Sequence, residues 1–305
     1  MLFGQFDSHR GDDFLRKQQI GVIGLGLLGS ALAARLSQSG FCVMGYDIDA
    51  DKRELLKDLD GRRCESPDEV IHGCQVVFLS LPTSRVVQQI VNNCWKSLTP
   101  TSTLIDTTTG DPEEVIQTHQ LLEQYQTQYV EANVAASSHQ IRSGHGTLFL
   151  GGSEAVVREQ EPILDAICEK RYYLGEIGSA SRFKLVHNLI LGLHRAVLAE
   201  GLTFAEELGF EPTTVVEILQ QTPAVSGVMA TKGQKMAMAD YSVQARLSQH
   251  LKDVNLILNE AQRKGASTPL SELHRSILEH AEGLGYGDAD NSAVIEAFRS
   301  SSSGV

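Results

Sequence analysis

Three closely spaced glycines, Gly24, Gly26 and Gly29, follow a short apolar run and precede an amphipathic helical pattern. The run Gln19–Ile23 is typical of a buried strand, and Leu28–Leu36 is typical of the helix that leaves it. The glycines allow a tight turn and a close approach to the backbone, while unpaired N–H groups at the helix N-terminus favour an anion. The pattern predicts a site for the pyrophosphate of a dinucleotide, although a glycine turn in another parallel α/β protein, such as a methyltransferase or a flavoprotein, would share the spacing.

An acidic residue at the end of the next predicted strand supports this site. Phe41–Tyr46 is the expected strand, and Asp47 follows at the offset of about 20 residues where a carboxylate accepts hydrogen bonds from the adenosine ribose. This carboxylate would repel a 2′-phosphate, so we expect NAD to be preferred, with NADP possible. Asp49 is an alternative acid, and Lys52 or Arg53 could accommodate a phosphate.

A second pair of residues able to do chemistry lies much further along the chain. Lys184 and Asn188 are four residues apart on a predicted helix, so both could contact one substrate from the same helical face. A lysine amine can give or take a proton at a substrate oxygen, and Lys184 is the best placed titratable group. Burial or a positive nicotinamide ring would have to lower its ordinary pKa of about 10.4. His187 is better explained as a packing or hydrogen-bonding neighbour than as a catalyst.

The patterns around the glycine turn and around Lys184 predict an α/β domain followed by a helical domain. From Ile20 to about Leu174, short apolar runs alternate with helical patterns, which predicts a doubly wound parallel sheet. The later strands are expected at Val76–Ser80, Thr103–Asp106, Tyr129–Ala132, Leu148–Leu150 and Arg171–Leu174. Beyond Gly178 only helical periodicity remains. The helices are expected at Ser181–Leu208, Thr213–Gln221, Gly227–Met238, Leu247–Lys264, Leu270–Gly283 and Asp290–Arg299.

The chain is therefore expected to contain two domains and two flexible ends. A Rossmann-type NAD(P)-binding domain is predicted over residues 18–178, and an all-helical domain for substrate binding and dimerisation over residues 179–300. The long helix after residue 178 would join them. A flexible extension is predicted over residues 1–17 and a flexible tail over residues 301–305.

Composition favours small-molecule chemistry. Of 305 residues 42% are hydrophobic, and the formal net charge of −12 argues against nucleic acid and anionic membranes as partners. Five cysteines without CxxC spacing indicate reduced thiols in a cytoplasmic protein, and no metal site is predicted. We find no leader pattern and no apolar run long enough to span a bilayer.

Four blocks in order along the chain resemble the β-hydroxyacid dehydrogenase family, which includes 3-hydroxyisobutyrate dehydrogenase, tartronate semialdehyde reductase and 6-phosphogluconate dehydrogenase. The blocks are the glycine turn with Asp47, Leu81-Pro82 with Asp106–Pro112, Lys184–Asn188, and Lys252-Asp253. The second block is similar to the family's D-x-S-T-x-x-P element, with Thr108 in the serine place. The resemblance covers most of the chain.

The resemblance implies a role for each block. The lysine of similar enzymes handles the proton of the substrate hydroxyl and the asparagine orients the substrate, so Lys184 and Asn188 are the expected catalytic residues and also contact the substrate. The expected cofactor-binding residues are Gly24, Leu25, Gly26, Leu27, Leu28, Gly29, Asp47, Leu81, Pro82, Thr108, Thr109 and Lys252.

The segment Glu131–Ser137 departs from the family's D-A-P-V-S-G-G stretch, whose serine hydroxyl and backbone N–H groups bind the substrate carboxylate. Its proline and its Ser-Gly-Gly are replaced, and alanine side chains stand where glycine would admit a ligand. Arg142 could replace the lost donors, although a solvated loop arginine explains it better. The expected substrate-binding residues in this loop are Ala135, Ala136 and Ser137.

We therefore expect an NAD-preferring oxidoreductase of the 3-hydroxyisobutyrate dehydrogenase type, acting on a small 3-hydroxy acid or its semialdehyde or keto form. Leu191 stands where decarboxylating relatives carry a glutamate, and Lys184 argues against imine reductases of the same fold. The alternative is a cofactor-binding but inactive dehydrogenase-like protein, which the altered loop favours and Lys184 opposes. We expect a cytoplasmic homodimer or homotetramer.

Overall fold

The computed structural model describes residues 18–302, with side chains described as far as Ser300. The extension predicted over residues 1–17, and residues 303–305 of the predicted tail, lie outside the described part. The chain divides into two compact units, with the boundary between Lys184 and Leu185.

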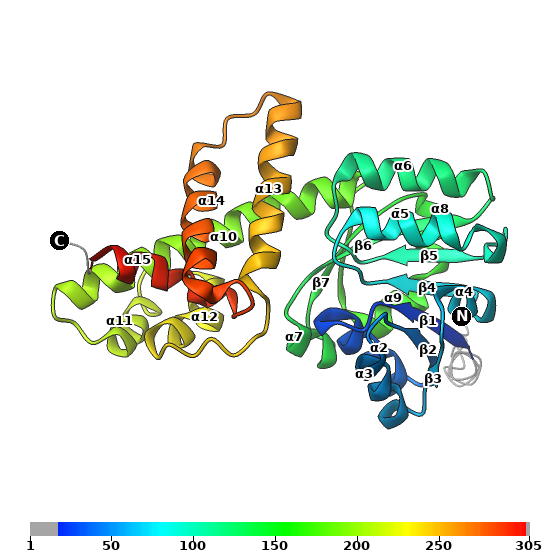
Figure 1. The fold of residues 1–305 in the computed structure, drawn as a ribbon, viewed down its shortest axis with the longest axis horizontal. Helices are drawn as coiled ribbons and strands as arrows, with labels where there is room; N and C mark the ends of the chain where they lie inside the picture. Colours follow the sequence, from blue (N-terminus) through cyan, green and yellow to red (C-terminus); the bar gives the residue numbers. More distant parts are fainter. Residues whose placement is uncertain (1–17, 303–305) are drawn as a thin grey trace, which may run out of the picture. The chain divides into compact units, whose positions relative to one another are not determined.

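An eight-stranded sheet forms the first unit (Figure 1). The strands are β1 (Gln19–Ile23), β2 (Cys42–Tyr46), β3 (Arg62–Arg63), β4 (Val76–Leu79), β5 (Thr103–Asp106), β6 (Gln128–Ala135), β7 (Thr147–Gly151) and β8 (Lys170–Tyr173), in the spatial order β3-β2-β1-β4-β5-β6-β7-β8. The predicted strands are all present. The strand β3 was not predicted, because its two exposed arginines carry no apolar pattern.

The sheet is mixed rather than wholly parallel. Neighbouring strands from β3 to β6 run parallel as predicted, but β7 is antiparallel to β6, with Ala135 opposite Thr147. Residues 136–146 connect the two strands and include only the short helix α7 (Ser138–Arg142). This connection is shorter than the crossover of a dozen or more residues that a parallel neighbour needs, so the chain turns back beside β6.

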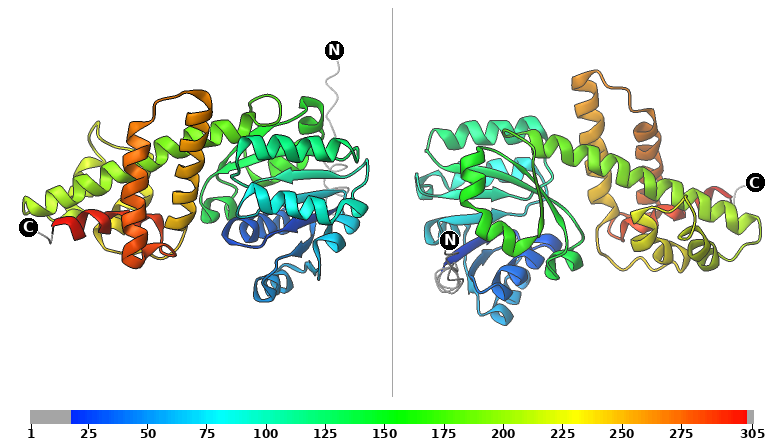
Figure 2. Two further views of the ribbon diagram at one scale, coloured as in Figure 1. Left: turned by 45° about the horizontal axis from the view of Figure 1, so that its top comes forward. Right: turned by 180° about the vertical axis from the view of Figure 1, so that it is seen from behind.

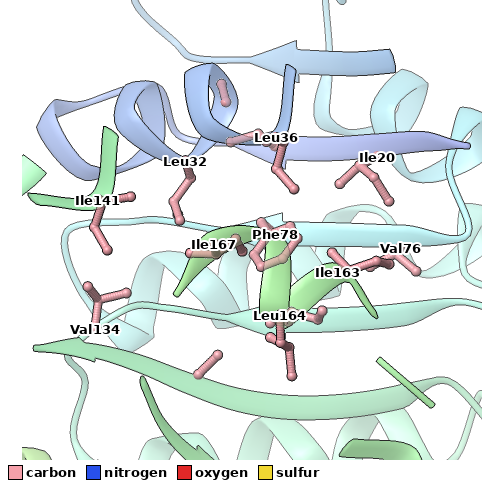
Figure 3. Close-up of a cluster of buried hydrophobic side chains, with 14 of the residues drawn as sticks. Ile20, Leu32, Leu36, Val76, Phe78, Val134, Ile141, Ile163, Leu164 and Ile167 are labelled. Carbon is pink, nitrogen blue, oxygen red and sulfur yellow. The ribbon is translucent and has the colours of Figure 1, made fainter. Parts of the chain in front are cut away.

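Helices cover both faces of the sheet because its strands are apolar on both sides. One face packs Ile20 and Phe78 against Leu32, Leu36 and Leu164 of the helices (Figure 3). Figure 2 shows α5 and α6 on the opposite face from α9. The helices of this unit are α2 (Leu27–Gln38), α3 (Ala50–Arg53), α4 (Pro67–Gly73), α5 (Ser84–Asn93), α6 (Pro112–Glu123), α7, α8 (Glu154–Glu159) and α9 (Glu161–Ile167), with short 3₁₀ turns at Glu54–Leu59 and Trp95–Ser97.

The second unit is helical throughout its described residues, as predicted. The long helix α10 (Ser179–Glu207) begins in the first unit and continues through the second. It is followed by α11 (Pro212–Leu219), α12 (Gly227–Ala237), α13 (Leu247–Lys264), α14 (Pro269–Ala281), a π-helical turn (Glu282–Tyr286), a 3₁₀ turn (Asn291–Val294) and α15 (Ile295–Ser302). One apolar core joins these helices. No helix among residues 18–302 is long and apolar enough to cross a membrane.

Candidate active site

The three glycines of the first motif form the turn from β1 into α2, and each has a different structural setting. Gly24 has φ +92°, and a Cβ there would overlap the carbonyl oxygen of Ser80. A Cβ at Gly29 would overlap the carbonyl oxygen of Gly24, so α2 packs directly on the turn. Gly26 has φ −66°, and a Cβ there would meet nothing within 4 Å. The fold therefore requires Gly24 and Gly29, whereas Gly26 borders open space.

The N-terminus of α2 lies at this open space. Gly26 is its N-cap, no side chain caps the helix, and its first turn, which includes Leu27 and Leu28, holds no acidic residue. Backbone N–H groups and the helix dipole are thus available to an anion that can approach Gly26 closely. The residues of the turn fit the pyrophosphate of a dinucleotide.

Asp47 fixes the turn from the end of β2. Its side chain is buried, and its carboxylate accepts hydrogen bonds from the backbone N–H of Leu25 (2.7 Å) and of Asp49 (2.9 Å). A carboxylate has about four acceptor positions, so the same group can also accept from ribose hydroxyls. The Lys52 Nζ lies 3.7 Å from Asp47 Oδ1 and 3.7 Å from Asp49 Oδ2.

The loops after β4 and β5 meet beside the glycine turn. The backbone N–H of Leu81 donates to Thr108 Oγ1 (3.1 Å), and the N–H of Thr108 donates to Asp106 Oδ1 (2.8 Å). Two side chains of β6 support these loops. The Tyr129 hydroxyl donates a hydrogen bond to Asp106 Oδ2 (2.6 Å), and Asn133 Nδ2 donates one to the Thr108 carbonyl (2.8 Å). Burial raises the pKa of the Asp106 carboxyl. Sequence reasoning missed Tyr129 and Asn133, because supporting side chains on a strand carry no motif of their own.

Pro82 and Thr109 directly follow Leu81 and Thr108 in these two loops. The structure therefore brings most of the predicted cofactor residues to one edge of the sheet, at the carboxyl ends of β1, β4 and β5, where ligands bind in open α/β sheets.

Two contacts tie the start of α10 to β6 and position Lys184. Glu131 accepts hydrogen bonds from the backbone N–H of Gly178 (2.6 Å), the backbone N–H of Ser181 (2.9 Å) and the Ser181 hydroxyl. Burial raises the pKa of the Glu131 carboxyl, and these donors oppose that effect. Three residues further along β6, the carbonyl of Val134 accepts a hydrogen bond of 2.6 Å from Lys184 Nζ. The Lys184 side chain is 7% exposed.

In the loop predicted to bind the substrate carboxylate, the hydrogen-bond donors of Ser137 bind another residue of the loop. Ala135 ends β6, Ala136 follows, and Ser137 is the N-cap of α7. The Ser137 N–H (2.8 Å) and hydroxyl (3.1 Å) both donate to Gln140 Oε1, and the Gln140 N–H returns a bond of 3.3 Å to Ser137 Oγ. The Ser-x-x-Gln spacing predicts this capping box and could have been noticed in the sequence. Arg142 approaches Ser30 of α2, with Nη2 3.4 Å from Oγ.

Asn188 and Lys252 belong to the second unit, where both contact Asp253. Asn188 is buried and donates from Nδ2 to Asp253 Oδ2 (2.9 Å), while His187 Nδ1 lies 3.0 Å from Asn188 Oδ1. The Lys252 Nζ lies 2.9 Å from Asp253 Oδ1. On the continuous helix α10, Lys184 and Asn188 are one turn apart on the same face.

Fold and glycine turn together define an NAD(P)-binding oxidoreductase with a helical second unit. The family model described as the NAD binding domain of 6-phosphogluconate dehydrogenase matches residues 19–175, and the model described as NAD-binding of NADP-dependent 3-hydroxyisobutyrate dehydrogenase matches residues 178–298. The chain belongs to the β-hydroxyacid dehydrogenase family. It is an NAD(P)-dependent dehydrogenase of the hydroxy-acid type.

Relatives with known names cover nearly the whole chain. It is 27% identical to 2-(hydroxymethyl)glutarate dehydrogenase of Eubacterium barkeri, over 92% of this chain and 94% of that protein, and 27% identical to glyoxylate/succinic semialdehyde reductase 1 of Arabidopsis thaliana, over 92% and 98%. It is also 26% identical to the cytokine-like nuclear factor N-PAC of Drosophila melanogaster, over 93% of this chain but 48% of that protein, so the chain spans about half of N-PAC.

Solved structures share the fold. A 3-hydroxyisobutyrate dehydrogenase of Mycobacterium tuberculosis with L-serine superposes with a TM-score of 0.83 at 22% identity, covering 93% of this chain and 99% of that one. A 3-hydroxyisobutyrate dehydrogenase of Salmonella typhimurium gives 0.86 at 22% identity, covering 92% and 99%. These likenesses confirm the predicted fold.

Proposed function

We propose that the enzyme transfers hydride between nicotinamide and a small 3-hydroxy acid or its semialdehyde or keto form, with Lys184 as general acid and base. The observation that carries the proposal is the buried Lys184 amine, bonded at 2.6 Å to Val134 and one helical turn from Asn188. The bound nicotinamide supplies the hydride acceptor or donor. Lys184 takes the proton of the substrate hydroxyl during oxidation and returns it during reduction.

The fixed position of Lys184 suits this role. The Val134 carbonyl holds the amine at a defined place on β6, and the Glu131 contacts hold the helix that carries it. Burial keeps bulk water from competing with the substrate for the amine. A catalytic acid or base must lie within hydrogen-bonding reach of the oxygen that it serves, and a side chain anchored in this way loses little entropy on reaching it.

Asn188 orients the substrate in this proposal. An ionised Asp253 can only accept, so its contact with Asn188 identifies the amide nitrogen and leaves the second N–H of that nitrogen for a substrate oxygen. Asp253 thereby acts as a positioning residue for Asn188. Lys252 balances the charge of Asp253.

The proposed cofactor preference is NAD over NADP. The buried Asp47 carboxylate stands where a 2′-phosphate would bring two further negative charges. Lys52 already lies between the carboxylates of Asp47 and Asp49, which offsets its attraction for a phosphate. Five free cysteines fit a reducing compartment, the predicted cytoplasm.

An inactive, cofactor-binding protein is the second candidate. The capping box that occupies the Ser137 donors favours it, because those donors would otherwise serve the substrate carboxylate. A relative whose name describes a nuclear factor rather than an enzyme fits the same alternative. The buried pair Lys184 and Asn188 opposes it.

A substrate panel tests the proposal. The purified protein is supplied with NAD⁺ or NADP⁺ and 3-hydroxyisobutyrate, glycerate or 2-(hydroxymethyl)glutarate, and in the reverse direction with NADH or NADPH and glyoxylate or succinic semialdehyde. We expect at least one hydroxy acid or its carbonyl form to change the absorbance of the reduced nicotinamide, faster with NAD than with NADP. Binding of NADH without turnover of any member would support the inactive alternative.

A further inference from the structure

The short helix α7 packs against α2, the helix that begins at the glycine turn. Ile141 of α7 is buried and belongs to the apolar cluster that contains Leu32 and Leu36 of α2 (Figure 3). Gly144 follows α7 with φ +73°, and a Cβ there would come within 2.9 Å of the Arg35 guanidinium. These contacts fix α7 on α2, and both helices belong to the first unit.

Arg142, the last residue of α7, reaches the first turn of α2. Its Nη2 donates a hydrogen bond to Ser30 Oγ (3.4 Å), and the Ser30 hydroxyl donates one to the Leu27 carbonyl (3.1 Å). The backbone N–H of Ser30 donates to the carbonyl of Gly26 (2.9 Å), so Ser30 lies one helical turn from the N-cap. Side chains on a helix lean toward its N-terminus. The Arg142 guanidinium therefore lies beside the helix end that is open to an anion.

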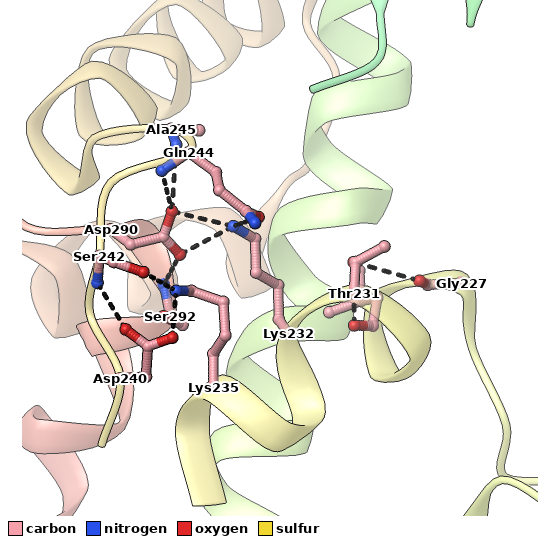
Figure 4. A network of polar contacts seen from close by, with 11 residues as sticks. Gly227, Thr231, Lys232, Lys235, Asp240, Ser242, Gln244, Ala245, Asp290 and Ser292 are labelled. Carbon is pink, nitrogen blue, oxygen red and sulfur yellow. Dashed lines mark hydrogen bonds and ion pairs between the residues drawn. The ribbon is translucent and has the colours of Figure 1, made fainter. Parts of the chain in front are cut away.

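Arg142 has no acidic partner among residues 18–302, unlike other cations of this protein. Between residues 18 and 184, every arginine except Arg35 and Arg142 forms an ion pair with an aspartate or a glutamate. Arg35 donates instead to a backbone carbonyl (2.7 Å). In the second unit, Lys232 of α12 binds both oxygens of Asp290 (2.7 and 2.9 Å; Figure 4). Since a guanidinium carries five N–H donors, most of those of Arg142 remain for a ligand.

We propose that Arg142 binds the pyrophosphate of the dinucleotide, together with the backbone N–H groups at the N-terminus of α2. This inference rests on the cofactor site of the proposed function but does not require turnover. Gly26 lets the pyrophosphate approach the backbone, and a planar guanidinium can donate two parallel hydrogen bonds to phosphate oxygens. In a chain with a formal net charge of −12, a cation at this place also offsets the repulsion between the protein and an anionic cofactor.

Titration with NADH and with ADP-ribose tests this assignment, because ADP-ribose carries the pyrophosphate but no nicotinamide. Arg142→Met should raise the dissociation constants of both ligands by about tenfold or more, since a charge-assisted contact is lost. The affinity for adenosine, which has no phosphate, should not change. Arg158→Met is the matched control, because it removes the same charge from an exposed arginine of α8 that pairs with Glu154. It should leave all three affinities at their wild-type values.

Two further measurements distinguish a direct contact from a structural role. Arg142→Lys keeps the charge without the planar pair of donors, and it should give intermediate affinities even if the methionine variant does not fold. In about 1 M NaCl, where the screening length is only about 3 Å, the difference between the wild-type protein and Arg142→Met should shrink. A difference that is the same at low and high salt would show that the substitution acts through the packing of α7, and it would contradict the inference.

The binding data also separate this inference from the proposed function. A protein that binds NADH but turns over no member of the substrate panel would refute the proposed function, and the titrations would still test Arg142. Unchanged affinities for NADH and ADP-ribose in Arg142→Met would overturn the inference, as would a wild-type protein that binds neither ligand. A loss confined to NADPH would assign Arg142 to the 2′-phosphate, and a rise in the KM of the acid substrate alone would assign it to the substrate carboxylate. Either result would also overturn the inference.

Discussion

Single residues explain why the glycine turn fits a dinucleotide. Gly24 and Gly29 are required by the protein itself, because a side chain at either position would strike a backbone carbonyl. Gly26 has an ordinary backbone conformation and open space beside it, so packing does not account for a glycine there. A ligand that must approach the backbone does account for it.

Substitution of these glycines should therefore separate folding from binding. Gly26→Ala should leave the free energy of unfolding close to that of the wild-type protein and weaken NADH binding by at least about tenfold, since tenfold corresponds to only about 1.4 kcal/mol. Gly24→Ala is the matched control and should destabilise the fold, because of its positive φ and the overlap with Ser80. Fluorescence titration and urea unfolding measure the two effects. Unchanged NADH affinity in Gly26→Ala would argue against a dinucleotide at this turn.

The buried His274 should make stability depend on pH. Its pKa of about 4 in the folded protein lies below the ordinary value of about 6.5, so the unfolded chain binds more protons between these values. The stabilisation from neutral His274 is complete above about pH 6.5 and is lost as the pH falls toward 4. The wild-type protein should lose up to about 3 kcal/mol more than His274→Gln between pH 7 and 4 in urea unfolding. Equal losses in both proteins would contradict this assignment.

At the level of elements, β6 and the first turns of α10 act as one support for Lys184. The Glu131 carboxylate accepts from two N–H groups and a hydroxyl at the helix start, and Val134 binds the Lys184 amine. The position of the amine therefore depends on a strand and a helix start that are held together by a single carboxylate.

Glu131→Gln should weaken this support. The amide nitrogen of glutamine would face N–H donors, so the free energy of unfolding should fall by about 1–3 kcal/mol and kcat should fall with it. Glu113→Gln is the control. Glu113 of α6 pairs at the surface with Arg182 of α10, and a surface ion pair is worth about 1 kcal/mol or less. Equal effects of the two substitutions would show that the Glu131 contacts do not position Lys184.

The sequence predicts the elements better than their connections. Alternating apolar runs located seven of the eight strands, and helical periodicity located α10 to within two residues of each end. The reversal of β7 was not predicted, because a short apolar strand has the same pattern in either direction. The capping box of Ser137 and Gln140 follows from local spacing and was overlooked. The contact between Glu131 and Ser181 of α10 joins residues 50 positions apart, so no local pattern predicts it. The roles of Lys184, Asn188 and the cofactor residues stay predictions.

On the scale of the whole molecule, α10 presents an apolar stripe to solvent. Its members are each at least 49% exposed and fall within an arc of about 40° on the side of the helix opposite Asn188 and Arg195. They are Val186, Ile190, Val197, Phe204 and Leu208. Apolar stripes of this kind are typical of interfaces between subunits, and we propose that this stripe forms an interface of the predicted homodimer or homotetramer.

A charge placed in this stripe should dissociate the dimer. The double variant Val197→Glu, Phe204→Glu should be monomeric by light scattering at concentrations where the wild-type protein has twice the mass of the chain, because association would bury two unpaired carboxylates. Tyr172→Glu on β8, an exposed aromatic residue of the first unit, is the control and should remain dimeric. A wild-type monomer, or a double variant that still dimerises, would exclude the stripe as the interface.

Lys184→Met tests the proton-transfer role of Lys184 most directly, because it keeps the length and apolar stem of the side chain and removes the amine. With the substrate that the panel identifies, kcat should fall by at least about 100-fold, while the NADH dissociation constant stays close to that of the wild-type enzyme. Lys170→Met, at an exposed lysine that begins β8, should change neither value. A Lys184→Met enzyme that turns over this substrate at the wild-type rate would contradict the proposed mechanism.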